Sequence, residues 1–307
     1  MRPAFIDADR LARLLPIGDA IDALEALFAA PLPETPRRVR NETPSGELLL
    51  MPAFGSRYAG VKLVTVAPAN PSRDLPVVQG TYVLLDAHTL TPVSVVDGTA
   101  LTALRTAAVS GLATRHLTRP NARALVIFGA GVQANAHLDA MMAVRDVSSL
   151  GVISRSPEPA AALAARAEYL GITAAVTGPE GVREADIVCT CTTSPRPLFD
   201  GSQLRPGVHV NAVGAYRPDQ RELDDDTVRR GRLVVETREA ALAEAGDLLI
   251  PIERGVIGRD DIVADLAELV QGERVRRSPE DVTVFKSVGV AFEDLAVAAA
   301  AYERYAA

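Results

Sequence analysis

The segment that most constrains the fold runs from residue 124 to residue 134, where the apolar run Ala-Leu-Val-Ile-Phe leads directly into Gly-Ala-Gly-Val-Gln-Ala. An apolar strand followed at once by small residues predicts a tight turn into a helix. Gly129 permits the turn, Gly131 lets the backbone approach a pyrophosphate, and Ala134 keeps the helix close to the strand. The start of such a helix offers free N–H groups to phosphates. The segment therefore predicts a dinucleotide site, and its binding residues are Gly129, Ala130, Gly131, Val132 and Gln133.

The glycine motif alone also fits a purely structural strand, turn and helix, so the surrounding pattern has to decide. Short β-like runs alternate with helical stretches from about residue 121 to residue 236. The expected strands are 124–128, 150–153, 186–190, 208–213 and 233–236, and the expected helices begin near residue 132 and cover 158–170. Strands that alternate with helices predict the α/β class: a Rossmann-type, doubly wound parallel sheet with helices on both faces.

The N-terminal part of the chain has a different pattern, in which strands follow one another directly. An amphipathic helix at 20–28 precedes strand-like runs at 47–51, 60–67, 81–86 and 92–97, and a helix at about 101–115 follows. This order predicts an antiparallel or mixed sheet, and thus an α+β domain. Pro120 marks the seam before the first Rossmann strand. We expect the α+β domain to consist of residues 1–117 and the returning C-terminal helix, 290–307, and the nucleotide-binding domain to span 118–289.

Composition excludes several classes of function. A net charge of -7 leaves no broad basic surface for nucleic acid. Asp7 and Asp9 fall where a secretory signal needs an apolar core, and no run reaches the ~20 apolar residues of a membrane helix. We therefore expect a cytoplasmic protein without nucleic-acid or membrane partners. Cys189 and Cys191 are expected to be reduced core thiols, and the four histidines lack metal-ligand spacing, so we expect no metal.

The residues after the second Rossmann strand indicate which nicotinamide cofactor is preferred. NAD-binding proteins place an acidic residue there, whereas a cation suits the 2′-phosphate of NADP. This chain has Ser154, Arg155 and Ser156 and no carboxylate. An arginine fork and two hydroxyl groups fit a phosphate. The segment favours NADP(H), with NAD(H) possible, although Arg155 would also be ordinary on a surface turn.

Three cations of the first domain are candidates for binding an anionic substrate. Arg38 lies between Arg37 and Arg40, so a solvated surface position is the plain alternative for it. Lys62 shares a strand face with Val64 and is expected to point inward, where it must be paired or lose its proton more easily than in water. Arg105 lies on a helix among small residues. Two arginines and a lysine would suit a substrate that carries a carboxylate and a reactive nitrogen.

Seven short blocks, in order along nearly the whole chain, resemble the ornithine cyclodeaminase/mu-crystallin family. They are Leu-Met-Pro-Ala at 50–53, Gly-Val-Lys at 60–62, Asp-Gly at 97–98 with Thr-Ala-Leu-Arg-Thr-Ala-Ala at 102–108, Gly-Ala-Gly-Val-Gln at 129–133, Asn-Ala-Val-Gly-Ala at 211–215, Arg-Pro-Asp-Gln-Arg-Glu-Leu-Asp at 217–224, and Thr-Val-Phe-Lys-Ser-Val-Gly at 283–289. Seven blocks in register are far more specific than the glycine motif alone.

The resemblance implies roles for particular residues. Arg38 and Arg105 match the family's carboxylate-binding arginines, and Lys62 matches its substrate-site lysine, so these three are the predicted catalytic residues. The segments that match the family's cofactor contacts add further residues to the glycine turn, namely Thr192, Asn211, Val213, Ser287 and Val288. The resemblance also implies a homodimer formed through the sheet of the first domain, which is then the substrate-binding and dimerisation domain.

Two departures from the cyclodeaminase pattern reduce the number of activities to be expected. Where cyclodeaminases carry an aspartate in a Gly-Gly-Asp run, this chain has Gly214-Ala215-Tyr216, and their glutamate before Met-Pro is replaced by Leu49. The sequence therefore predicts an NAD(P)H-dependent reductase of an α-imino acid, either a ketimine or cyclic imine reductase or an amino acid dehydrogenase like alanine dehydrogenase. The alternatives are a redox-neutral ornithine cyclodeaminase and a crystallin-like protein that binds NADP(H) with little catalysis.

Overall fold

A computed structural model describes residues 2–33 and 35–307 of the chain, which divides into two compact units. Unit 1 comprises Met1–Arg105 and Val290–Ala307, and unit 2 comprises Thr106–Gly289. The division falls within helix α3 (Gly98–Leu117), whereas the boundary expected from the sequence lies at the end of this helix. Among the described residues, no helix is both long enough and apolar enough to cross a bilayer.

Unit 1 is built on a six-stranded sheet in the described part of the chain. Its strands, in spatial order, are β1 (Ala4–Ile6), β6 (Pro92–Asp97), β5 (Val78–Asp86), β4 (Tyr58–Val66), β3 (Gly46–Phe54) and β2 (Val39–Thr43). Neighbouring strands from β2 to β6 are antiparallel, whereas β1 pairs in parallel with β6. The expected mixed sheet is thus present.

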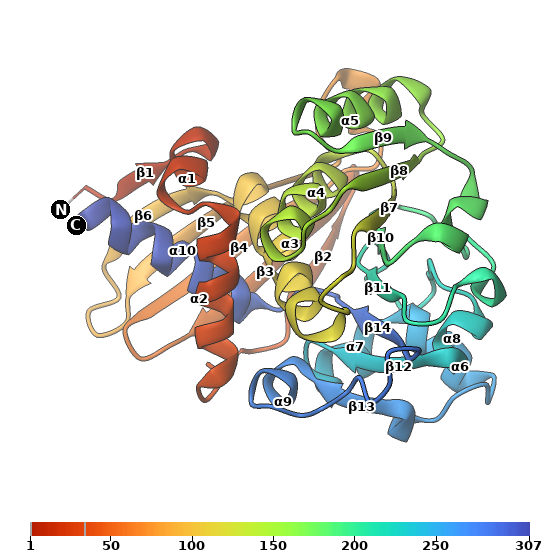
Figure 1. The fold of residues 1–307 in the computed structure, drawn as a ribbon. Coiled ribbons are helices and arrows are strands. Elements are labelled where there is room, and N and C mark those ends of the chain that lie inside the picture. The colour runs from red at the N-terminus through yellow and green to blue at the C-terminus, as the bar shows by residue number, and fades with distance from the viewer. Residues whose placement is uncertain (1, 34) are drawn as a thin grey trace. The chain divides into compact units, whose positions relative to one another are not determined.

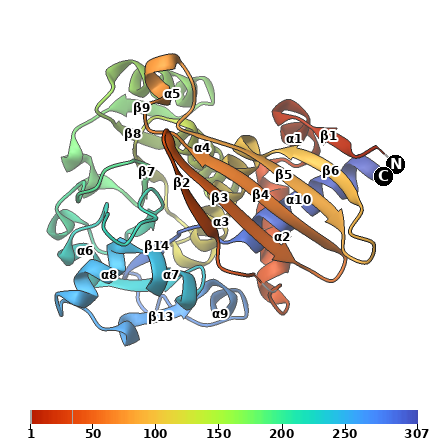
Figure 2. The same ribbon diagram turned by 180° about the vertical axis from the view of Figure 1, so that it is seen from behind.

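Helices cover one face of this sheet. The helices of unit 1 besides the start of α3 are α1 (Ala8–Leu14), α2 (Ile17–Ala29) and α10 (Ala291–Ala306), and a short 3-10 turn covers Asn70–Arg73. Helix α10 packs on β3, β4 and β5 and against α2, which places the C-terminal helix in unit 1. The opposite face of the sheet carries no helix of unit 1 (Figure 2). Alternate residues of each strand therefore meet different surroundings, as a period of two requires.

Unit 2 is a doubly wound α/β domain, as the sequence predicts (Figure 1). Its strands, in spatial order, are β13 (Ile262–Asp265), β12 (Gly231–Val235), β14 (Val282–Lys286), β11 (His209–Ala212), β10 (Ile187–Thr190), β7 (Ala124–Phe128), β8 (Ser149–Ile153) and β9 (Thr173–Val176). All the pairings are parallel. The connecting helices are α4 (Val132–Val144), α5 (Pro157–Tyr169), α6 (Asp225–Arg230), α7 (Arg238–Glu244), α8 (Gly246–Glu253) and α9 (Leu266–Val270), with 3-10 turns at Pro179–Glu184, Gly201–Gln203 and Arg259–Asp261.

The central strand β7 of unit 2 is apolar throughout, as expected where helices bury both faces of a parallel sheet. In β7, Leu125, Val126, Ile127 and Phe128 are all buried. Phe128 stacks on Phe199 with ring centroids 5.3 Å apart. The chain reverses its winding at β7: β8 and β9 lie on one side and β10 on the other. Such a switch point is where an open α/β sheet leaves a crevice at the carboxyl ends of its strands.

Candidate active site

The glycine turn between β7 and α4 has the geometry that a dinucleotide requires. Gly129 adopts φ +100°, and a Cβ atom there would lie 2.5 Å from the carbonyl oxygen of Cys191. A Cβ atom on Gly131 would have no heavy atom within 4 Å, so the backbone is open to a ligand at that point. Gly131 is also the N-cap of α4 and gives no side-chain hydrogen bond to the helix start. The turn therefore fits a pyrophosphate, with the first N–H groups of α4 available to bind it.

The other predicted cofactor residues lie at the same edge of the sheet. Each follows or ends a strand, and the five strands concerned, β14, β11, β10, β7 and β8, are consecutive neighbours. These residues are Ser154, Arg155 and Ser156 after β8, Thr192 after β10, Asn211 and Val213 at the end of β11, and Ser287 and Val288 after β14. The structure thus gathers residues that are far apart in the sequence along one edge of unit 2.

The side chains at this edge differ in whether they are exposed to a ligand. Arg155 and Ser156 are exposed and Ser154 is half-buried, so all three can meet a ligand. The Asn211 side chain is fully buried, and its Nδ2 donates to Thr114 Oγ1 at 2.9 Å. Its amide therefore serves the interior of unit 2, which leaves its backbone as the part that could face a cofactor.

A buried carboxylate, Glu222, ties the ends of β10 and β11 together. Its Oε1 accepts hydrogen bonds from Thr192 N at 2.9 Å and Thr192 Oγ1 at 2.6 Å. Its Oε2 accepts from Thr190 Oγ1 at 2.8 Å and Gly214 N at 2.7 Å. Burial, followed by the nearby charge of Asp247, raises the pKa of Glu222, while Lys286 and the threonine hydroxyls act in the opposite direction. One side chain thus fixes two loops of the predicted cofactor edge.

Two further buried carboxylates hold the end of β14 and the segments beside it. Lys286 Nζ lies 2.8 Å from Asp247 Oδ2, and Asp247 Oδ1 accepts from the backbone N–H groups of Glu222 and Leu223. Glu236 Oε1 accepts from Ser287 Oγ at 2.8 Å, and its Oε2 accepts from the N–H groups of Val288 and Gly289. The Ser287 and Val288 segment is therefore fixed by a carboxylate that the sequence did not single out.

In unit 1, Lys62 is buried within the sheet, as its place on the strand predicts. It is 1% exposed, and its Nζ lies 2.7 Å from Asp294 Oδ1. Burial, and next the positive charge of Arg105, lower the pKa of Lys62 to about 8, whereas Asp294 opposes this shift. A buried lysine with this pKa is protonated at pH 7 and can still give up its proton readily.

Arg105 joins the same cluster through two carboxylates of α10. Its Nε donates to Asp294 Oδ1 at 3.0 Å, and its Nη1 donates to Glu293 Oε2 at 3.3 Å. Both carboxylates are fully buried. Arg38, half-buried before β2, lies close enough for its charge to contribute to the lowered pKa of Lys62. The structure therefore brings the three predicted substrate-site cations into one electrostatic cluster.

Sequence reasoning missed the acidic partners of this cluster, although two signals were available. Glu293 and Asp294 lie in the apolar first part of α10, and acidic side chains on its buried face need cationic partners. A second signal is the use of lysine: of the 32 basic residues, only Lys62 and Lys286 are lysines. Both are 1% exposed and both are paired with an aspartate.

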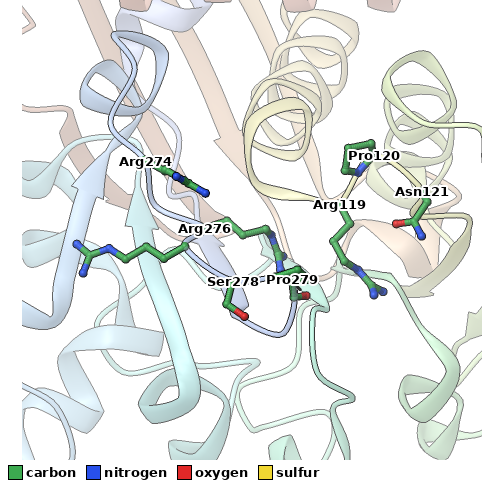
Figure 3. A pocket seen from close by; sticks show the side chains of 8 residues that line it. Arg119, Pro120, Asn121, Arg274, Arg276, Ser278 and Pro279 are labelled. Carbon is green, nitrogen blue, oxygen red and sulfur yellow. Dashed lines mark hydrogen bonds between the residues drawn. The ribbon is translucent and has the colours of Figure 1, made fainter.

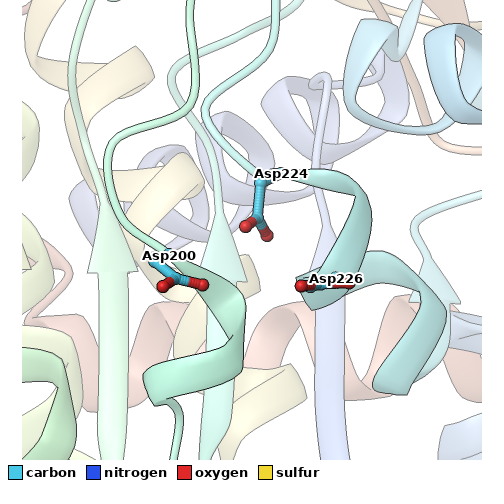
Figure 4. A group of neighbouring side chains, drawn as sticks. All are labelled: Asp200, Asp224 and Asp226. Atoms are coloured by element: carbon cyan, nitrogen blue, oxygen red, sulfur yellow. The ribbon is translucent and has the colours of Figure 1, made fainter.

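Unit 2 also contains a group of three acidic side chains, which follow the glycine turn by about 70 residues or more in the sequence. Oxygen atoms of Asp200, Asp224 and Asp226 lie within 4.8 Å of one another (Figure 4). Asp224 is the N-cap of α6 and accepts hydrogen bonds from Thr227 and from Gly201 N, and Asp200 caps the 3-10 turn that follows it. Capping accounts for two of the three carboxylates, and the absence of a metal stays a prediction.

An arginine-lined pocket of about 350 Å³ lies at the opposite, amino-terminal edge of the same sheet (Figure 3). Its walls come from the segments that precede β7 and β14. Arg119 donates to Asp186 Oδ1 at 2.6 Å, and Arg276 donates to the carbonyl oxygens of Leu117 and Asp281. These two guanidinium groups thus bind carboxylate and backbone oxygens of unit 2 itself.

Comparisons with known proteins give one consistent result. The model of the ornithine cyclodeaminase/mu-crystallin family matches residues 5–307. A Δ1-pyrroline-2-carboxylate reductase of Bacillus cereus is 41% identical over 263 residues, which is 83% of this chain and 81% of that protein.

Solved structures agree with the sequence matches. The Δ1-pyrroline-2-carboxylate reductase of Thermococcus litoralis, solved with NADH and L-proline, has a TM-score of 0.93 and 35% identity and covers 99% of this chain and 97% of its own. An archaeal alanine dehydrogenase dimer with bound NAD has a TM-score of 0.94 and 32% identity and covers 100% of this chain and 97% of its own.

Proposed function

The chain belongs to the ornithine cyclodeaminase/mu-crystallin family, and from this premise we propose that it is an NAD(P)H-dependent reductase of an α-imino acid. The family membership and the Rossmann-type fold predicted from the sequence are confirmed. The predicted class of enzyme is that of relatives named as reductases and dehydrogenases of imino or amino acids. The observation that carries the proposal is the buried cluster of Lys62 with Arg105, Asp294 and Glu293, which offers a proton donor next to a carboxylate-binding cation.

In this proposal each residue of the cluster has one task. The guanidinium groups of Arg38 and Arg105 bind the carboxylate of the substrate. Lys62 donates its proton to the nitrogen of the C=N bond while hydride reaches the carbon, so the double bond becomes an amine. The hydride is the contribution of the reduced nicotinamide when it is bound. The fixed cations also orient the substrate, which lowers the entropic part of the barrier.

We propose NADP(H) as the preferred cofactor because exposed Arg155 follows β8 and no carboxylate stands beside it. Relatives have been solved with NADH or NAD, so use of NAD(H) is the competing outcome. The Arg155→Asp variant should lower kcat/KM for NADPH about tenfold or more relative to NADH, because one charge-assisted contact to a phosphate is lost. Arg183→Asp, which removes another exposed arginine of unit 2, is the matched control. An unchanged cofactor ratio in Arg155→Asp would remove this role from Arg155.

We also propose a homodimer formed through the face of the six-stranded sheet that carries no helix of unit 1. The strand register aligns apolar side chains across this face, namely Phe5, Val95, Val83, Val61 and Pro52. Phe5 is 61% exposed, and Leu63 on the same face is 38% exposed. A continuous apolar row on an uncovered sheet suits burial against a second copy.

The cyclodeaminase alternative finds no support in the residues that would distinguish it. Buried Leu49 and half-buried Tyr216 stand at the two positions where the cyclodeaminase pattern carries carboxylates. The proposed reaction is tested by following NADPH and NADH oxidation with cyclic imino acids, and with 2-oxo acids plus ammonia. Oxidation of the cofactor with formation of the amino acid supports the reductase. Ammonia released from ornithine without net cofactor oxidation would instead indicate a cyclodeaminase, and cofactor binding without turnover would indicate a crystallin-like protein.

A further inference from the structure

One carboxylate oxygen in unit 1, Asp294 Oδ1, accepts hydrogen bonds from both Lys62 Nζ and Arg105 Nε. We propose that Asp294 is the positioning residue of the site: it holds the proton donor beside the carboxylate-binding arginine and keeps Lys62 charged for the next turnover. This inference rests on the proposed imino acid reduction for its purpose. The link between Asp294 and Lys62 can nevertheless be measured without it.

The burial and the contacts of Lys62, Arg105 and Asp294 fix their arrangement. Lys62 comes from β4, Arg105 from α3 and Asp294 from the first turn of α10. The side chains of Lys62 and Asp294 are 1% and 0% exposed, and that of Arg105 is 7% exposed. The two hydrogen bonds are 2.7 Å and 3.0 Å long. At such burial no bulk water can replace the carboxylate as an acceptor, so the shared oxygen fixes the two cations relative to each other.

The second oxygen of Asp294 supports this assignment. Oδ2 is buried and has no hydrogen-bond partner among the residues that the structure describes. The hydrogen bonds that Asp294 accepts within residues 2–33 and 35–307 therefore all come from the two predicted substrate-site cations. A buried carboxylate is costly unless charged or polar partners compensate it. Its retention here is consistent with a role at the site.

The charges around Lys62 show why one carboxylate decides its protonation. Arg105 of α3 and Arg38 before β2 both favour the neutral amine, as burial does. Tyr82, which pairs with Lys62 in the register of β4 and β5, is fully buried, and burial raises its pKa well above the ordinary range, so it stays neutral. Glu293 on α10 bonds to Arg105. Asp294 is the carboxylate that bonds to Lys62 itself, so its removal leaves the ammonium beside two guanidinium groups.

The shared oxygen also bears on the class of substrate. It keeps the ammonium of Lys62 and the guanidinium of Arg105 close together. An α-imino acid carries its nitrogen on the carbon next to the carboxylate, so its two polar groups are equally close. The arrangement favours such substrates over acids whose nitrogen lies at the far end of the chain.

The use of lysine in this chain provides a direct experiment. Because Lys62 and Lys286 are the only lysines, protein labelled with 13C-lysine gives two side-chain signals, and Lys286→Arg assigns them. In the wild type, the Lys62 signal should titrate near pH 8. In Asp294→Asn, its midpoint should fall by about one pH unit or more, because a charged partner is lost. Glu293→Gln is the matched control: a buried neighbour on the same helical turn whose described cationic partner is Arg105, so the Lys62 midpoint should move less.

The activity profile gives the second measurement. The alkaline limb of kcat/KM for imine reduction should move to lower pH in Asp294→Asn and stay in place in Glu293→Gln, while KM rises in both because Arg105 loses a partner. An unmoved Lys62 midpoint in Asp294→Asn would overturn the inference, even if the protein reduces imines. If the Lys62 midpoint moves but the protein reduces no imine, the link between Asp294 and Lys62 is supported and the proposed function is contradicted. Should the asparagine variant not fold, Asp294→Glu keeps the charge and should retain the midpoint but raise KM, and a wild-type KM would contradict the positioning role.

Discussion

The Glu222→Gln variant tests how much the buried carboxylate contributes to the cofactor edge of unit 2. Glutamine has the same shape, but only one end of its amide accepts hydrogen bonds. Oε1 of the native residue accepts from Thr192 N and Oε2 accepts from Gly214 N. In either orientation of the amide, one of these fixed backbone N–H groups would face an NH₂ group. The two threonine hydroxyls can rotate, but the backbone cannot.

The expected loss of stability in Glu222→Gln follows from these contacts. A buried N–H left without an acceptor costs about 1–3 kcal/mol, and the remaining bonds lose their charge assistance. Relief of the repulsion between Glu222 and Asp247 offsets part of this cost. We expect a net loss of about 2 kcal/mol, which lowers Tm by about 4–8 °C in a unit of this size. Binding of NADPH should weaken as well, because the loops after β10 and β11 lose their common anchor.

Differential scanning calorimetry and a fluorescence titration with NADPH measure the two effects. Glu168→Gln, on the exposed surface of α5, is the control for loss of a glutamate charge and should keep Tm within about 1 °C of the wild type. A Glu222→Gln protein with the same Tm and the same NADPH affinity as this control would refute the reasoning.

Two other expectations concern stability and assembly. Burial lowers the pKa of His137 to about 4 and that of His209 to about 3, so between these values and about 6.5 the unfolded chain binds more protons and stability falls as the pH falls. Urea unfolding should give a free energy of unfolding about 3–4 kcal/mol lower at pH 5 than at pH 7, and His137→Gln should remove about half of this difference. The same pH dependence of the unfolding free energy in the variant and the wild type would contradict the buried neutral state of His137. For the dimer, Val83→Lys on the open sheet face should shift sedimentation to the 32.5 kDa monomer, whereas Val176→Lys, at an exposed position on β9, should not. A Val83→Lys dimer would place the interface elsewhere.

The sequence predicted much of the fold because its strongest signals are local. The run from Ala124 to Phe128 and the small residues after it define β7 and the turn into α4 without tertiary information. Strands β1, β2, β9, β13 and β14 were not among the expected strands. Strand β2 is mostly polar and β9 is half alanine, so neither run has a clear strand pattern, and β13 and β14 lie beyond residue 236, where the expected alternation ended.

A residue of the site was predictable from the sequence where a charged side chain stood among apolar neighbours. Lys62 stands among strand residues that point inward, and the structure buries it. The partners were not predictable in this way, because Asp294 lies 232 residues from Lys62 in the chain and only the return of α10 to unit 1 brings them together. Glu222 and Glu236 were missed for the same reason: a surface glutamate and a buried one look alike until the loops around them are placed.

The central claim, that Lys62 supplies the proton in the reduction of an α-imino acid, is tested most directly by one kinetic comparison. Reduction of Δ1-pyrroline-2-carboxylate is followed by NADPH oxidation in the wild type and in Lys62→Ala, alongside the affinity of each for NADPH. The account predicts a loss of about 100-fold or more in kcat for the variant, with cofactor affinity nearly unchanged. Wild-type turnover in Lys62→Ala would contradict it.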